Sequence, residues 1–203
     1  IGPNGKSGWL GQEGVDADGR SAWAFYGHNF LEFVVPATRT RPDAADAKRL
    51  FSRVDVANDP PDVEDAHDII DANDPNLSAF RKHGGKLLLY YGWADPQLNP
   101  MMGVEYYEQV VRAMGPTTGD FARLFMVPGM FHCGGGVGTS VFDAASPVVQ
   151  WVEGGKSPNR IEAARVVDGK VLRTRPLCPY PQAARYKGAG SIDDAANFTC
   201  ANP

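Results

Sequence analysis

The stretch GKLLLYYGWADP, residues 85–96, decides the fold of this chain. Its segment 86–91 is continuously apolar after the lysine, which is typical of a strand buried on both faces in a parallel sheet. A short helix is predicted just before it, at Leu77–His83, because Gly84-Gly85 supplies the left-handed conformation that ends many helices. The chain therefore enters its regular part with a helix followed by a buried strand.

Further segments carry the periodicity or the turn residues of regular structure. We predict a helix at 99–114, a buried strand at 121–127, a helix that Ser146-Pro147 opens and Gly154-Gly155 ends, and a hairpin of 161–167 and 170–175 around Asp168-Gly169. The order helix, strand, helix, strand, helix between residues 77 and 155 predicts a parallel α/β sheet with flanking helices.

The overall composition limits the possible functions. The chain has 203 residues and a formal net charge of -4, with a sequence pI of about 5.5. Nucleic-acid recognition is disfavoured, because binding phosphates requires clustered Lys and Arg. No apolar run reaches the length of a membrane span. Because the sequence begins at Ile1 without a leader, we expect a processed chain or a part of a longer protein.

The first 74 residues carry weaker signals. The aromatic segment 21–35 is either a buried helix or an irregular packed segment, and 43–51 has helical spacing. The acidic residues between Asp55 and Asp74 are interpreted as a solvated face. Residues 16–19 begin like a calcium loop but lack its later ligands, so we expect a turn there.

Three cysteines suggest how the C-terminal part is held together. Cys178 and Cys200 flank a tail rich in Pro, Gly and Ala, and a disulfide closing this loop would contribute roughly 3 kcal/mol. The alternative is two unrelated free thiols. A Cys178–Cys200 bond would leave Cys133 alone, and its partner would then lie outside this chain.

Two residues suited to acid–base chemistry follow the two predicted strands. Asp95 comes after the first strand and His132 after the second. Reactive groups of open parallel sheets lie just past the C-terminal ends of the strands, so a carboxylate and an imidazole can meet there. The order Asp then His is that of an α/β-hydrolase, in which a nucleophilic Ser comes earlier in the chain.

Other chemistries fit the sequence less well. Residues 134–136 are glycines without the Lys and Ser or Thr of a phosphate loop, and we expect them to let the backbone run close under His132. Adjacent His132 and Cys133 lack the second pair of ligands that zinc requires. A nucleophilic Cys133 would point away from its own base, and no serine has a strand–elbow–helix context. The remaining histidines are His28, which could line a pocket, and His67 and His83, which we expect to be exposed.

Several segments closely resemble the tannase/feruloyl esterase family. They are DPNLSAF (74–80), GGKL (84–87), GWAD (92–95), PG (128–129), HCGGG (132–136) and WVEGG (151–155). The resemblance is strong from about Asp74 to Pro181 and is still visible around Trp23–Phe33. These motifs are specific as a set, although no single one would be.

This resemblance implies a fold and a division of the chain. The fold would be the C-terminal portion of an α/β-hydrolase parallel sheet with flanking helices, plus a disulfide-stapled tail and part of a lid. Residues 1–73 would be the end of the lid and its return segment, 74–160 the core, and 161–203 the hairpin and the disulfide-closed tail. No cofactor or metal ligand is expected in this chain, and the family's calcium would be bound in the part of the lid that lies outside it.

The resemblance also implies roles for individual residues. Asp95 and His132 match the acid and base of the family's Ser-His-Asp triad, whose serine would lie outside this chain. Cys133 matches a cysteine that is disulfide-bonded to the residue before that serine. Cys178 and Cys200 match the C-terminal disulfide of the family. Leu98, just past Asp95, is expected to form part of the substrate pocket wall.

Three functional hypotheses follow. The first is a carboxylic ester hydrolase acting on tannin, feruloyl or similar aromatic-acid esters, with this chain as its acid–base part and the remaining N-terminal part of the enzyme as its partner. The second is a non-catalytic binding module derived from such a hydrolase, and the third is a small hydrolase that uses Cys133. In each case we expect a secreted or periplasmic protein without a nucleic-acid or membrane partner.

Overall fold

A computed structural model describes residues 69–203. The chain divides into two compact units, Ile1–Asp74 and Pro75–Pro203, and the second contains both the expected core and the expected tail. The expected aromatic segment, the expected helix at 43–51 and the turn at 16–19 lie outside the described residues. Within residues 69–203, no helix is long and apolar enough to cross a membrane.

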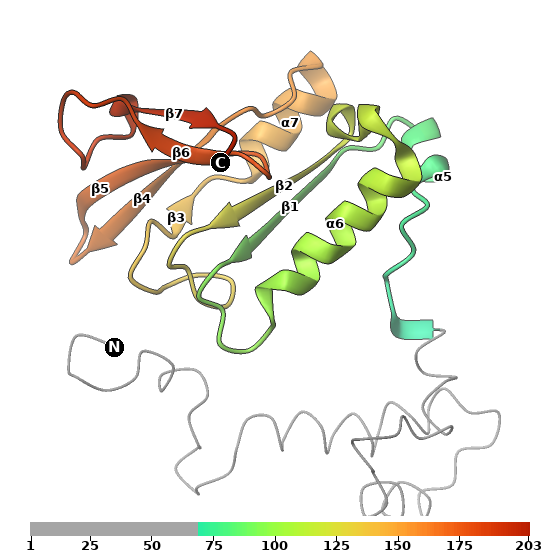
Figure 1. Ribbon diagram of the computed structural model, residues 1–203, viewed down its shortest axis with the longest axis horizontal. Coiled ribbons are helices and arrows are strands. Elements are labelled where there is room, and N and C mark those ends of the chain that lie inside the picture. Colours follow the sequence, from blue (N-terminus) through green and yellow to red (C-terminus); the bar gives the residue numbers. More distant parts are fainter. Residues whose placement is uncertain (1–68) are drawn as a thin grey trace, which may run out of the picture. The chain divides into compact units, whose positions relative to one another are not determined.

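Two parallel strands form the centre of the second unit (Figure 1). Helix α5 (Ser78–Lys82) precedes strand β1 (Leu87–Gly92), and helix α6 (Pro100–Met114) connects it to strand β2 (Ala122–Val127). The register runs from Leu87 opposite Ala122 to Gly92 opposite Val127. The predicted helix–strand–helix–strand order is therefore confirmed, with boundaries that differ by one residue or so.

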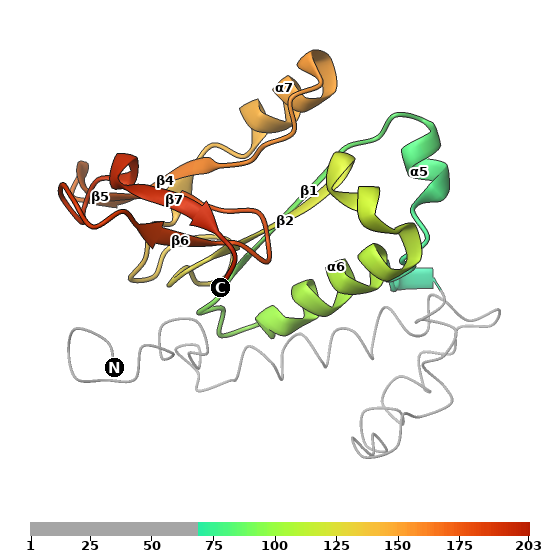
Figure 2. The same cartoon turned by 45° about the horizontal axis from the view of Figure 1, so that its top comes forward.

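The side chains of β2 alternate between two apolar clusters. Ala122, Leu124 and Met126 pack with Val104 and Tyr107 of α6. Phe125 and Val127 belong to a second cluster on the opposite face, which includes Met130, Ile161, Ala163 and Leu177. Figure 2 shows α6 and helix α7 (Ala145–Gly154) on opposite sides of the β1–β2 pair, which gives the layered α/β arrangement expected from the sequence.

Strand β1 is less buried than its apolar sequence predicts. Tyr90 is 40% exposed, and residues 87–89 are only half-buried. One edge of β2 pairs with β1, and the other is closed by Pro179 and by Tyr180, whose N–H donates to the carbonyl of Leu124 (2.7 Å). Within the described residues, the outer edge of β1 has no strand against it. The prediction that β1 is buried on both faces is therefore wrong for this part of the chain.

The helix ends follow two different capping patterns. Asn99 accepts the N–H of Met101 and Pro100 opens α6, so the N-terminus of α6 is set by local sequence. The prediction that Ser146 caps α7 is wrong. The carboxylate of Asp143 accepts the N–H groups of Ala145 and Ser146, which starts the helix before Ser146. The predicted end is confirmed, because Gly155 adopts a left-handed conformation with φ 67°.

The C-terminal third is antiparallel. The predicted hairpin is confirmed as strands β4 (Ile161–Val167) and β5 (Lys170–Leu177), joined at Asp168-Gly169. A short strand β3 (Val141–Phe142) pairs with β4. Strand β6 (Ala183–Tyr186) pairs with β7 (Phe198–Ala201), which was not predicted. Two short 3-10 helices, η3 (Pro116–Asp120) and η4 (Ala195–Asn197), complete the elements of this unit.

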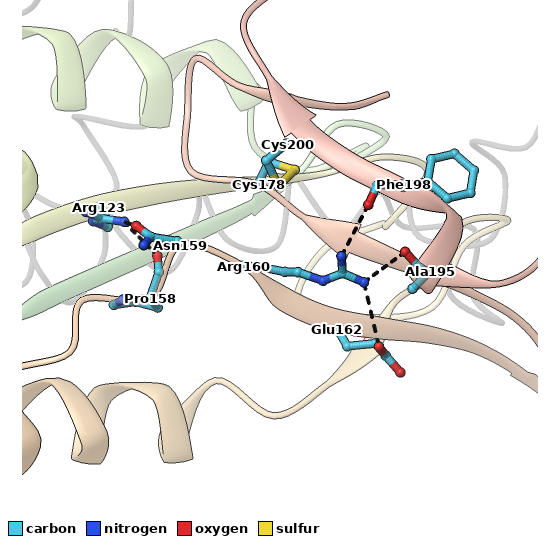
Figure 3. Close-up of a disulfide and its surroundings, with 9 residues drawn as sticks. All are labelled: Arg123, Pro158, Asn159, Arg160, Glu162, Cys178, Ala195, Phe198 and Cys200. Atoms are coloured by element: carbon cyan, nitrogen blue, oxygen red, sulfur yellow. Dashed lines mark hydrogen bonds and ion pairs between the residues drawn. A yellow bond between two sulfur atoms is a disulfide. The ribbon is translucent and has the colours of Figure 1, made fainter. Parts of the chain in front are cut away.

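The expected disulfide joins the end of β5 to β7 (Figure 3). Cys178 and Cys200 are bonded, with a Cα–Cα distance of 5.5 Å. The bond closes a chain segment that contributes few apolar side chains to either core cluster. It therefore supplies a constraint that burial does not.

We predict that replacing both Cys178 and Cys200 with Ala lowers the free energy of unfolding by about 3 kcal/mol, because the unfolded chain regains the entropy of the open loop. Urea unfolding followed by circular dichroism measures this loss. Cys133→Ala is the control, since Cys133 is exposed and makes no disulfide among the described residues. An equal loss in both proteins would contradict a stabilising role for the Cys178–Cys200 bond.

Candidate active site

The loops that follow β1 and β2 are bonded to each other at the carboxyl edge of the sheet. The N–H of Trp93 donates to the carbonyl of Val127 (3.0 Å), and the N–H of Ala94 donates to the carbonyl of Met130 (3.1 Å). These two bonds continue the parallel pairing past the last strand residues. Asp95, one residue further on, is thereby held beside the loop that carries His132.

Asp95 and His132 are in direct contact. The distance from His132 Nδ1 to Asp95 Oδ2 is 2.9 Å. The side chain of Asp95 is 3% exposed, whereas that of His132 is 34% exposed. The buried carboxylate therefore supports an imidazole that still reaches the surface, and the predicted proximity of the two side chains is confirmed.

The other oxygen of Asp95 is bonded to its own loop. Oδ1 accepts the N–H of Gln97 (2.8 Å) and of Leu98 (3.0 Å). Burial raises the pKa of Asp95, but the bonds from Leu98, His132 and Gln97 together outweigh it, so the pKa lies below the ordinary value of 3.8. Asp95 is therefore ionised at neutral pH. His132 Nδ1 then donates to it, which leaves Nε2 as the basic nitrogen of the neutral ring.

A pocket of about 230 Å³ opens at this pair. Leu98, 37% exposed, lines it, while the expected contact of Leu98 with a substrate stays a prediction. The pocket is further lined by Tyr90, Tyr91, Gly92, Met130 and Cys133. Sequence reasoning did not select the two tyrosines or Met130. The signal was present, because Tyr90 and Tyr91 lie just before Gly92, the last residue of β1, and so close to the Asp95 loop.

Glycines give the His132 loop its shape, although not all the expected ones take part. Met130 bridges to Gly136, and the N–H of Gly138 donates to the carbonyl of Gly129 (3.1 Å). A Cβ on Gly136 would lie 2.1 Å from the carbonyl oxygen of Gly129, so the close approach requires glycine there. Added Cβ atoms on Gly134 and Gly135 would meet nothing, so the prediction of close backbone approach fails for these two.

The remaining expected residues lie elsewhere. His83 is exposed on α5 and its ring contacts the carbonyl of Ala79 (2.7 Å), as expected for a histidine outside the site. His28 and His67 fall outside the described residues. Among residues 69–203 there is no cluster of three or more His, Cys, Asp or Glu suited to a metal. The family resemblance implies calcium in a part of the lid that lies outside this chain. The described residues therefore do not test that expectation.

Comparison with known proteins identifies the family. The family model described as "Tannase and feruloyl esterase" matches residues 35–201. This chain belongs to that family. Family membership agrees with the small parallel sheet, its flanking helices and the Cys178–Cys200 bond.

The relatives are several times longer than this chain. A mono(2-hydroxyethyl) terephthalate hydrolase of Piscinibacter sakaiensis is 50% identical over 135 residues, which are 65% of this chain and 22% of the relative. Feruloyl esterase B of Aspergillus niger is 34% identical over 149 residues, 64% of this chain and 29% of the relative. The solved structure of feruloyl esterase B from Aspergillus oryzae has a TM-score of 0.64 and 29% identity, covering 87% of this chain and 37% of that one. This family member thus spans about a quarter of the length of these curated relatives.

We predict that Gly92→Ala displaces the His132 loop. An added Cβ would lie 2.2 Å from the carbonyl oxygen of Met130 and 2.6 Å from that of Phe131. Such overpacking should lower the free energy of unfolding by about 1–3 kcal/mol. Urea unfolding measures the loss. The matched control is Gly119→Ala, where an added Cβ meets nothing. Equal stability of the two variants would contradict the close approach of the His132 loop to Gly92.

The stabilisation from Asp95 should depend on pH in a defined direction. Because its folded pKa is below 3.8, the ionised carboxylate contributes stability above that pH, and the contribution is lost as the pH falls through the folded value. The difference in the free energy of unfolding between the wild type and Asp95→Asn should therefore shrink from about pH 7 to about pH 3. Urea unfolding at each pH measures it, and a constant difference would show that the charge contributes nothing.

Proposed function

We propose that this chain is the acid–base part of a serine carboxylic ester hydrolase. Asp95 is the acid, His132 is the base, and the nucleophilic serine lies outside these 203 residues. The observation that carries the proposal is the 2.9 Å contact between a buried carboxylate and a half-exposed imidazole at the edge of a parallel sheet. A carboxylate in this position fixes the tautomer and orientation of the ring.

The proposed reaction uses Nε2 of His132 as a proton carrier. Nε2 takes the proton of the serine hydroxyl as its oxygen attacks the ester carbonyl carbon, and a tetrahedral intermediate forms. The proton then passes to the leaving alkoxide, which departs as an alcohol and leaves an acyl-enzyme. Water, deprotonated in the same way, releases the acid and restores the serine. Asp95 stays ionised throughout and stabilises the imidazolium.

The substrates are proposed to be esters of aromatic acids. Two rings, Tyr90 and Tyr91, together with Leu98 and Met130, line the pocket beside the polar pair. Such a wall offers apolar and ring contacts to an aromatic acyl group. The names of the relatives, a mono(2-hydroxyethyl) terephthalate hydrolase and feruloyl esterases, support the same substrate class. Leu98 is proposed to contact the substrate directly.

We propose that the part of the sheet that carries the serine pairs with the outer edge of β1. Within the described residues this edge is unpaired, and Tyr90 on β1 is 40% exposed, so further parallel strands can add there. Cys133, exposed and adjacent to His132, is proposed to form a disulfide with a cysteine beside that serine. Residues 1–73 are proposed to be the end of a lid and its return segment, with calcium bound in the rest of that lid.

An oxidising compartment fits these proposals. The Cys178–Cys200 bond is of a kind that persists in secreted or periplasmic proteins and is rare in the cytosol. We therefore propose that the enzyme is exported.

A chimeric enzyme tests the proposed function. Residues 69–203 of this chain replace the matching C-terminal part of the Piscinibacter sakaiensis hydrolase, and turnover of mono(2-hydroxyethyl) terephthalate and methyl ferulate is measured. The chimera should be active, and Asp95→Asn or His132→Ala should each lower kcat by about 10³-fold or more while the circular dichroism spectrum is unchanged.

Matched controls keep this experiment decisive. Asp168→Asn alters a carboxylate at the hairpin turn, where asparagine tolerates the positive φ of 50°, and His83→Ala removes an exposed ring. Both should retain the turnover of the chimera. If the Asp95 and His132 variants also retain it, or if the folded chimera is inactive, the chain is a non-catalytic binding module instead.

A further inference from the structure

A second cavity lies at the opposite end of β2 from the Asp95–His132 pair. It has a volume of about 590 Å³, and its walls come from the start of β2, from the loop before β4 and from the tail after β5. A neighbouring cavity of about 450 Å³ shares Tyr107, Gly119, Tyr180 and Pro181 with it. We call the two together the tail groove.

The tail groove is separate from the candidate active site. The four steps along β2 from Arg123, in the groove wall, to Val127 span about 13 Å, and His132 lies beyond them. No residue that lines the groove also lines the pocket at His132. Whatever occupies the groove is therefore not the ester group at the proposed catalytic pair.

Arg123 brings a positive charge to the groove, and no carboxylate of residues 69–203 pairs with it. Its Nε donates to the carbonyl of Gly119 (2.9 Å), and its Nη1 donates to the carbonyl of Pro158 (2.9 Å) and to the side-chain oxygen of Asn159 (Figure 3). The guanidinium also lies over the ring of Trp151, 5.9 Å from its centroid. All of these partners are neutral, so they orient the guanidinium and leave its charge in place. A guanidinium has five N–H groups, and those on Nη2 have no partner among residues 69–203.

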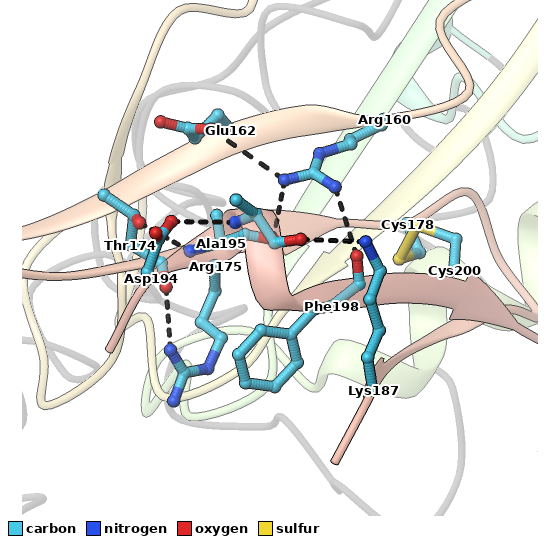
Figure 4. Close-up of polar contacts among 11 residues, drawn as sticks. Arg160, Glu162, Thr174, Arg175, Cys178, Lys187, Asp194, Ala195, Phe198 and Cys200 are labelled. Atoms are coloured by element: carbon cyan, nitrogen blue, oxygen red, sulfur yellow. Dashed lines mark hydrogen bonds and ion pairs between the residues drawn. A yellow bond between two sulfur atoms is a disulfide. The ribbon is translucent and has the colours of Figure 1, made fainter. Parts of the chain in front are cut away.

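Two further cations line the larger of the two cavities in the same way (Figure 4). Arg160 donates to the carbonyls of Ala195 (2.8 Å) and Phe198 (3.3 Å), and Lys187 donates to the carbonyl of Ala196 (2.8 Å). Within the described residues, the one ion pair made by these three cations is Arg160–Glu162, at 3.9 Å and with Glu162 63% exposed. Such a pair neutralises little charge.

The groove is also lined by aromatic rings and amide side chains. Tyr107 and Tyr180 stand edge to face with centroids 6.3 Å apart, and both hydroxyls are bonded, Tyr107 to the carbonyl of Ala122 and Tyr180 to Glu108. Three amide side chains line the same wall, those of Asn159, Gln182 and Asn202. Amides both donate and accept, which matches hydroxyl groups, while arginine and lysine match carboxylates.

We propose that the tail groove binds an acidic oligosaccharide, a short chain of uronate sugars. Arg123, Arg160 and Lys187 make one ion pair among the described residues, with the exposed Glu162, and Arg112 and Glu108 of the second cavity pair with each other. The remaining positive charge favours an anionic ligand, and the amides and tyrosines favour a hydroxylated one. The adjoining second cavity favours a chain over a single small anion. The groove would hold an acidic polymer at a distance from the ester that the proposed active site cleaves.

The disulfide fixes one wall of this groove. Cys200 lines it, and the bond to Cys178 holds β7 against the end of β5. Lys187 and the carbonyls that orient Arg160 come from the segment that this bond closes. The bond thus keeps Lys187 in the same groove as Arg123 and Arg160.

Isothermal titration of the full chain with trigalacturonate tests the proposal. We expect saturable binding with a Kd of about 1 mM or tighter, weakened at higher salt, and no binding of the neutral trisaccharide maltotriose. Lys187→Gln should weaken binding about fivefold or more. Lys170→Gln, which removes the same charge from the exposed start of β5 outside the groove, should change nothing. Circular dichroism confirms that both variants are folded.

Several outcomes overturn the proposal. Absence of trigalacturonate binding does so, as does an equal loss in the Lys187 and Lys170 variants. Equal affinity for inorganic phosphate would show a general anion site, and stronger binding of benzoate would show a site for an aromatic acid. Because binding is measured without ester turnover, these outcomes are independent of the proposed hydrolase function.

Discussion

The parallel pairing of β1 with β2 is the constraint on which the rest of this structure depends. It places Gly92 opposite Val127, so both loops leave the sheet at one edge. Two backbone bonds, from Trp93 and Ala94, then hold the loops together. A slip of one residue would turn alternate side chains to the wrong face and move Asp95 away from His132. The contact between the two side chains is thus a consequence of strand register.

Burial and hydrogen bonding give Asp95 and His132 different environments at this edge of the sheet. Asp95 is almost fully buried, yet three donors compensate its burial, which is why the pKa of a buried carboxylate lies below its ordinary value. The side chain of His132, by contrast, is 34% exposed. The glycines at 92 and 136 allow backbone segments to approach closely enough for this arrangement.

The sequence predicted the local features well. Continuous apolar runs identified the two strands, helical spacing of apolar residues identified α6, and Gly154-Gly155 identified the end of α7, because these signals act over a few residues. The proximity of Asp95 and His132 followed from the rule that parallel strands carry their reactive groups at one edge.

Features that depend on distant residues could not be predicted in the same way. Closure of the β2 edge by Pro179 and Tyr180 joins segments more than fifty residues apart. The cations of the tail groove likewise come together only in the folded chain. Backbone carbonyl groups orient them, and because every residue carries such a group, the sequence contains no signal for this arrangement. Ser146 shows the limit of local rules, since Asp143 competes for the same helix start.

The two edges of the sheet bear on the proposed function in opposite ways. Pro179 and Tyr180 of the tail pair with the edge of β2 that faces away from β1, so the sheet cannot gain a strand on that side. The edge of β1 is unpaired within the described residues, and its apolar side chains are only partly covered. Exposed apolar strands with free edges favour further pairing. Under the proposed function, the strand that carries the serine therefore lies beyond the outer edge of β1. It is then nearer to the Asp95 loop, which follows β1, than to the His132 loop, which follows β2.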